Sequence, residues 1–117
     1  MAVGALWNFG QDSGYLLGES LVGFTVGAAD GTIGRVERQE DRINMQHLVV
    51  DTGVWKFGGS VLIPAGIVTV IDSQEQTVSV SPSRDDIKTA PRFATDSETT
   101  DQEYLTEVGD YYHALGF

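Results

Sequence analysis

Short runs of apolar residues, separated by turn-forming residues, occupy the middle of the chain. The run at 77–81 alternates strictly, with Val78 and Val80 on one face, which is the period of a half-buried strand. Asp30-Gly31 is typical of a hairpin turn, because glycine adopts positive φ without steric cost. Gly34 in the next run indicates a bulge or a bend. The pattern predicts strands at residues 23–28, 32–39, 45–51, 60–63, 67–72 and 77–81.

Two helices are predicted after the last strand. Ser83 and Asp86 have the spacing of a capping box, with Asp86 in place of the usual Glu, and Pro91 ends the short helix that follows. Thr100 and Glu103 form a second capping box ahead of a longer tail helix. The apolar residues of the tail helix fall on one face of a 3.6-residue period. They are Tyr104, Leu105, Val108, Tyr111, Tyr112 and Leu115.

Composition divides the chain into three parts. Residues 1–18 form an aromatic, glycine-rich N-terminal arm, residues 19–93 hold the predicted strands, and residues 94–117 combine an acidic linker with the tail helix. The last part carries six acidic residues and no Lys or Arg. Gly109 costs the tail helix about 1 kcal/mol relative to alanine, so this helix needs a surface to pack against.

The apolar face of the tail helix has two interpretations. It folds back on the chain's own strands, or it binds a second subunit or another protein, as amphipathic helices bind grooves. A small β domain that carries such a helix on a linker favours a homodimer or a larger assembly. Exchange of the helix between subunits is one way to form it.

The net charge of −10 and the absence of cysteine narrow the classes of function. An acidic chain repels phosphate backbones, which argues against nucleic-acid binding. Without cysteine there is no disulfide framework, thiol nucleophile or thiolate metal site. The two histidines, His47 and His113, lack further ligands at metal-site spacing, so we expect neither a metal nor a cofactor.

Two observations bear on the cellular compartment. Residues 1–24 lack the positive start and apolar run of a secretory signal. The longest strongly apolar stretch without charge, at 60–71, is shorter than the roughly 20 residues of a spanning helix. We therefore expect a cytoplasmic protein that contacts membranes peripherally at most.

Six short strands in 117 residues predict a small antiparallel barrel or sandwich within one domain. Four segments define it further: 30–36 (DGTIGRV), 47–53 (HLVVDTG), 61–64 (VLIP) and 83–91 (SRDDIKTAP). In this order and spacing they resemble the PRC-barrel family, named for the barrel of the photosynthetic reaction centre H chain. Phe93 after the last segment fits the same pattern, and the tail from Tyr104 to Tyr112 is similar to that of stand-alone members.

The resemblance implies a mostly β fold. The expected architecture is a six-stranded antiparallel PRC-like β-barrel at residues 19–93, with a short closing helix and a C-terminal amphipathic helix. Family members dock on partners, and no general enzymatic activity goes with the family. We therefore expect a non-enzymatic protein-interaction module that dimerises and docks on a protein partner. The analogy with the H chain leaves open an accessory role in a membrane electron-transfer complex.

Asp51-Thr52-Gly53 follows two apolar residues, as in aspartic proteases. Their chemistry needs two carboxylates that share a proton, so a chain of this length would supply the second Asp by dimerising. The alternative is that Asp51 ends a strand and Thr52-Gly53 forms the turn after it. We prefer the structural interpretation and keep the dimeric protease as the enzymatic alternative.

Aromatic residues are the main candidates for partner contact, since they dominate interface energetics. Trp55 and Phe57 stand in a glycine-bearing loop, where they either contact a partner or cap the end of the barrel. Trp7 and Phe9 in the N-terminal arm raise the same pair of alternatives. The candidate partner-binding residues are Trp55, Phe57, Tyr104, Val108, Tyr111 and Tyr112.

Overall fold

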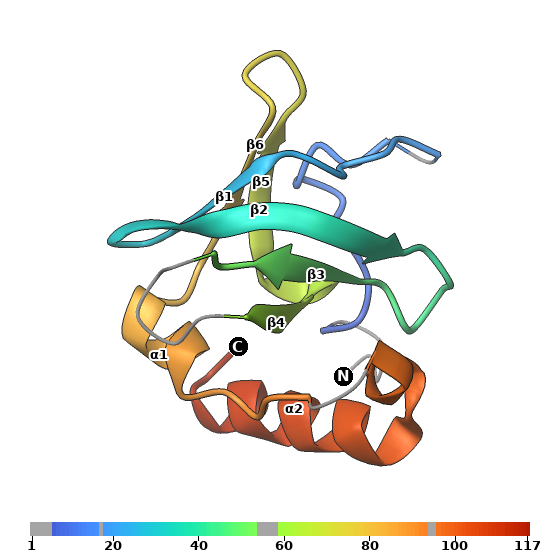
Figure 1. The fold of residues 1–117 in the computed structure, drawn as a ribbon. Helices are drawn as coiled ribbons and strands as arrows, with labels where there is room; N and C mark the ends of the chain where they lie inside the picture. Colours follow the sequence, from blue (N-terminus) through green and yellow to red (C-terminus); the bar gives the residue numbers. More distant parts are fainter. Residues whose placement is uncertain (1–5, 17, 54–58, 94–95) are drawn as a thin grey trace.

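Six strands form a single sheet in the computed structural model, which describes residues 6–16, 18–53, 59–93 and 96–117 (Figure 1). The strands are β1 (Thr25–Ala28), β2 (Gly31–Glu40), β3 (His47–Asp51), β4 (Ser60–Pro64), β5 (Val68–Asp72) and β6 (Thr77–Val80). Each predicted strand has its counterpart. The predicted contact residues Trp55 and Phe57 lie outside the described residues.

The sheet is mixed and open, so the expected antiparallel, closed barrel is wrong. The strand order is β4-β3-β2-β1-β6-β5. β1 pairs with β6 in parallel, whereas every other neighbouring pair is antiparallel. β4 and β5 are the two edge strands and do not pair, and β4 ends at Pro64, which has no backbone N–H. The chain instead turns through a one-turn 3₁₀ helix, η1 (Ala65–Ile67), before β5 begins.

The N-terminal arm bonds to η1 and to the β5 edge of this open sheet. The Leu6 carbonyl accepts a hydrogen bond from Gly66 N in η1 at 2.7 Å, and the Ser13 carbonyl accepts one from Ile71 N on β5 at 2.7 Å. Leu6 is buried, and Trp7 and Phe9 pack against the core. From Leu6 to Ser13, the arm is therefore part of the folded structure.

Gly34 lies at a β-bulge, as the sequence indicates. The β1–β2 pairing shifts by one residue where Val26 and Gly27 face Gly34 and Thr32. A Cβ atom added to Gly34 would lie 2.1 Å from the Asp51 carbonyl oxygen, far inside van der Waals contact. Only glycine therefore allows β2 to pass so close to the end of β3.

Two helices follow the sheet, and their caps partly match the prediction. In α1 (Arg84–Lys88), the Ser83 side chain accepts from Asp86 N at 3.2 Å, which confirms Ser83 as the residue that caps the short helix. For α2 (Gln102–Ala114), Thr100 as the capping residue is wrong. Thr100 belongs to a 3₁₀ helix, η2 (Asp96–Thr100), and the neighbouring Asp101 carboxylate caps α2 instead.

The apolar face of α2 folds back on its own chain, beneath β4 and beside α1 (Figure 1). The Tyr104 hydroxyl donates to the Pro91 carbonyl at 2.9 Å. The Tyr111 hydroxyl donates to the Asp86 carbonyl and lies 2.6 Å from the Thr89 hydroxyl. Of the two interpretations of the tail helix, the one in which it folds back on its own chain therefore describes its position within one chain. The buried residues on this face are Tyr104, Leu105, Val108 and Tyr112.

Replacing Gly34 by alanine is expected to destabilise the fold by about 2–3 kcal/mol, because the new methyl group collides with the Asp51 carbonyl. Gly27→Ala is the matched control on the paired strand, since nothing lies within 4 Å of its added Cβ. Urea denaturation measures both. Equal stability of the two variants would contradict the close approach of β2 to β3.

Tyr112→Phe is expected to leave stability unchanged or to raise it by up to about 1 kcal/mol, because the Tyr112 hydroxyl is buried and has no hydrogen-bond partner among the residues that the structure describes. Tyr104→Phe is the matched comparison and is expected to cost about 1 kcal/mol, since it leaves the Pro91 carbonyl without its donor. Thermal and urea unfolding of the two variants test this. A larger loss for Tyr112→Phe would mean that its hydroxyl is paired in solution.

Candidate functional site

A groove of about 300 Å³ runs between α2 and the N-terminal arm. Trp7 of the arm and Asn44 of the β2–β3 loop form one wall. The other wall is a single stripe of α2, because its residues recur at helical spacing. The stripe consists of Gln102, Leu105, Thr106, Gly109, Asp110 and His113.

Gly109 determines how closely the arm approaches the helix. A Cβ atom at this position would lie 3.4 Å from Trp7 Nε1 and 4.0 Å from Trp7 Cζ2. The N–H edge of the indole therefore faces the helix where the helix has no side chain. Leu6 lies at the same place, with its Cδ2 at 3.8 Å. The glycine that lowers helix propensity is thus the position against which the arm packs.

Gln46 anchors the arm to the β2–β3 loop. Its backbone N–H donates to the Trp7 carbonyl at 2.8 Å, and its side-chain oxygen accepts from Phe9 N at 3.0 Å. Its side-chain nitrogen donates to the Asp41 carbonyl at 3.2 Å. Only 4% of Gln46 is exposed, so these bonds satisfy a buried amide. Gln46 was not identified from the sequence because its partners Trp7 and Phe9 lie far from it along the chain.

The Asn44 wall of the groove is held by a reciprocal pair of hydrogen bonds. Asn8 Nδ2 donates to Asn44 Oδ1 at 3.0 Å, and Asn44 N donates to Asn8 Oδ1 at 2.8 Å. Asn44 has a φ of 68°, a left-handed conformation that asparagine adopts more readily than most residues. The wall formed by Trp7 and Asn44 is therefore held in place by hydrogen bonds within the chain.

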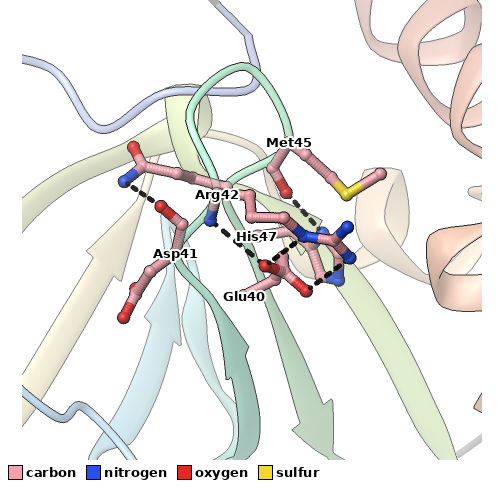
Figure 2. A network of polar contacts seen from close by, with 6 residues as sticks. Glu40, Asp41, Arg42, Met45 and His47 are labelled. Carbon is pink, nitrogen blue, oxygen red and sulfur yellow. Dashed lines mark hydrogen bonds and ion pairs between the residues drawn. The ribbon is translucent and has the colours of Figure 1, made fainter.

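His47 lies behind Trp7, at the start of β3. The two rings meet edge to face, with centroids 6.2 Å apart. His47 Nδ1 lies 2.9 Å from the Met45 carbonyl oxygen, to which the neutral imidazole donates (Figure 2). Burial lowers the pKa of His47, against the raising effects of the Met45 carbonyl and Glu40. The ring therefore belongs to the packing behind the groove.

A pair of charged side chains lies beside His47. Arg42 Nε is 3.0 Å from Glu40 Oε2 (Figure 2). The hydrogen bond from Arg42 lowers the pKa of Glu40. Both residues stand at the end of β2 and in its loop, so this pair braces the loop that carries Asn44.

A second cavity of about 320 Å³ lies between β2, β3 and η2. Its lining combines two glutamates with Arg38 and His47, so it does not favour a ligand of one charge. The remaining lining residues are Val22, Gln39, Val49, Thr99 and Thr100. This cavity shares no lining residue with the groove.

Asp51 has a local structural role. Its Oδ1 accepts a hydrogen bond from Gly53 N at 2.8 Å, and Thr52 N donates to the Gly59 carbonyl at 2.9 Å. The Asp-Thr-Gly segment thus ends β3 and starts a turn. Across residues 6–16, 18–53, 59–93 and 96–117, no three His, Cys, Asp or Glu side chains gather where they could hold a metal ion. In the same ranges, no helix is long and apolar enough to cross a membrane.

None of the four predicted contact residues that the structure describes lines the groove. Tyr104, Val108 and Tyr112 are covered by the chain itself. Tyr111 is half-buried, and its hydroxyl is engaged with α1. The structure instead gathers Trp7 with residues that no local pattern places beside it. Leu105, Gly109 and His113 were noted from the sequence for other reasons, as part of an apolar helix face, as a glycine inside a helix and as one of two histidines.

Comparison with known proteins adds no assignment. No protein-family model matches the chain, and no curated protein matches it.

The depressed pKa of His47 is expected to make the fold less stable in acid. The unfolded histidine takes up a proton near pH 6.5, whereas the folded one does so only at lower pH. Stability is therefore complete above about pH 6.5 and falls as the pH drops toward the folded-state pKa. Urea unfolding at several pH values measures this slope.

His47→Gln is expected to flatten the slope between pH 7 and 5, and the exposed His113→Gln serves as the control that keeps it. All three proteins carry the same carboxylates, so the difference between their slopes isolates the contribution of His47. An unchanged slope in His47→Gln would mean that another group controls the acid response.

Proposed function

We propose that this chain is a non-enzymatic interaction module of the PRC-barrel type, which docks on a protein partner through the groove between α2 and the N-terminal arm. The observation that carries the proposal is the contrast between the two faces of α2. The apolar face is consumed by packing within the chain. The stripe along the groove keeps polar side chains exposed, among them Thr106 and Asp110.

The groove has the features of a recognition site. Its sheet-side wall is fixed by Gln46 and by the Asn8–Asn44 pair, so little ordering entropy is lost when a partner binds. Trp7 supplies a large aromatic surface, and tryptophan is enriched among residues that dominate binding energy. Polar groups at the rim can fix the orientation of the partner.

The resemblance to PRC-barrel proteins supports the same function. The segments that carry it form the β1–β2 hairpin, β3 with its turn, the end of β4, and α1. The open, mixed sheet departs from the closed barrel of the family. Docking therefore rests on the groove itself, with the resemblance as a secondary support.

The geometry at Asp51 favours a non-enzymatic role over the dimeric protease. Its carboxylate caps the turn at Gly53, which is sufficient reason for an aspartate there. A peptidase assay of the wild type and of Asp51→Asn across pH 3–7 tests the alternative. Activity lost in Asp51→Asn would replace the present proposal with the protease.

Self-association is a second part of the proposal. Leu115 and Phe117, at the end of α2, are 41% and 39% exposed. Apolar side chains at one end of a helix can pair with a second copy in a homodimer. Sedimentation velocity over a range of concentrations measures this. A chain that stays monomeric would remove the dimer and leave partner docking untouched.

Blocking the groove is expected to abolish partner capture. Thr106→Trp places a bulky ring in the groove from an exposed helical position, and Ala114→Trp adds the same ring to α2 outside the groove. Tagged wild type and Ala114→Trp should retain the same partner from native cells, and Thr106→Trp should lose it. Deletion of α2 is a poorer test because it would expose core residues such as Val108.

Two results would contradict the proposal. Equal capture by all three proteins would place the docking surface elsewhere on the chain. Failure of every variant to retain any partner, with folding verified by circular dichroism, would remove docking as the function.

A further inference from the structure

We propose that the groove binds an arginine side chain, presented by a basic segment of the protein partner, between the Trp7 indole and the Asp110 carboxylate. This inference rests on the proposed docking function and names the chemistry of the partner. Its evidence is the charge around the groove, the donor and acceptor groups that line it, and its size.

The negative charge along α2 favours a positively charged ligand. The chain from 94 to 117 carries six acidic residues and no Lys or Arg. Asp110 is exposed at the groove, and its carboxylate makes no hydrogen bond or ion pair with any residue that the structure describes. It stands toward the C-terminal end of α2, where the helix dipole is also negative. A bound cation would offset both charges.

The aromatic wall suits the same ligand. Because the N–H edge of Trp7 lies against Gly109, a cation in the groove would have to meet the ring face, whose negative potential attracts it, and arginine is the usual partner. A guanidinium group is planar and presents five N–H donors. The residues that line the groove include acceptors for them, namely the Asp110 carboxylate and the side-chain oxygens of Thr106, Gln102 and Asn44.

Arginine fits this site better than lysine. A lysine ammonium is a strongly hydrated point charge with three donors and no plane to lie against the indole. His113 also lines the groove. At about 300 Å³, the groove lies at the small end of ligand sites, which suits one side chain.

Strand addition at the β5 edge is a poor alternative for a partner. The Ile71 N–H, which points away from β6, already donates to the Ser13 carbonyl at 2.7 Å. A Cβ at Gly14 would lie 2.9 Å from the Ile71 carbonyl oxygen, so the arm also covers the neighbouring acceptor. The arm therefore occupies this edge and at the same time builds the groove.

Two-dimensional ¹H–¹⁵N NMR titration of the full chain tests the inference at pH 7.5. The probes are N-acetyl-arginine amide and its uncharged isostere, N-acetyl-citrulline amide. A Trp55→Phe variant assigns the indole signal of Trp7. Arginine is expected to shift the Trp7 indole and the amides of Gly109 and Asp110, citrulline is expected to shift none of them, and 0.5 M NaCl is expected to weaken the arginine response.

Charge variants locate the site. Asp110→Asn is expected to weaken arginine binding about threefold to fivefold, as loss of a partly exposed ion pair would. Glu107→Gln removes the same charge from the same helix outside the groove and is expected to leave the affinity unchanged. Both positions are exposed, so neither variant is expected to unfold.

Three outcomes would overturn the inference: equal binding of citrulline, an equal loss in Glu107→Gln, or arginine shifts confined to other parts of the chain. These failures are distinct from failure of the docking function. A partner that is blocked by Thr106→Trp, combined with no arginine response at Trp7, would keep docking and reject the arginine site. A partner unaffected by Thr106→Trp would reject docking at the groove, whatever the probes show.

Discussion

The contact between the N-terminal arm and the open sheet is the constraint on which the rest of the structure depends. An open sheet leaves backbone groups at its edges, and buried backbone groups must be paired. The Leu6 carbonyl accepts a hydrogen bond from Gly66 N in η1. The Trp7 carbonyl accepts one from Gln46 N, just before β3, and the Ser13 carbonyl accepts one from Ile71 N on β5. The same segment gives α2 a surface to lie on, because Leu6 and Trp7 face Gly109. The arm thus supplies backbone hydrogen bonds of the kind that strand pairing would supply in a closed barrel.

Two glycines allow the close approaches that this arrangement needs. Gly34 lets β2 pass the end of β3, and Gly109 lets the indole of Trp7 reach the helix. Each position carries a cost in local conformational preference, of about 1 kcal/mol for glycine in a helix. Tertiary packing offsets that cost, because a larger side chain would separate the elements. At Gly109 the same approach also places an aromatic ring beside a row of polar side chains.

The strands, the Ser83 cap and the amphipathic tail were predictable because each depends on local periodicity or on residues a few positions apart. The pairing of β1 with β6 was not predictable, since no local pattern indicates which distant strand will lie alongside. Thr100 and Asp101 both have side chains that can cap a helix, and the sequence pattern does not distinguish them. In the structure, Thr100 is the last residue of η2 and Asp101 caps α2. The groove escaped detection for the same reason as the parallel pairing. Its walls come from opposite ends of the chain.

The tail helix shows why an apolar stripe alone does not identify a docking surface. Tyr104 and Tyr111 appeared suited to partner contact, yet their hydroxyls tie α2 to Pro91 and Asp86 of the same chain. Once that face is consumed, the features left for recognition lie on the adjoining stripe, where Asp110 has no partner among the described residues. The acidic residues are spread along the tail in the sequence. In the structure, the Asp110 carboxylate lines the same groove as the Trp7 indole. Packing of the apolar face therefore leaves the polar stripe of α2 exposed, and the proposed docking rests on that stripe rather than on exposed hydrophobic residues.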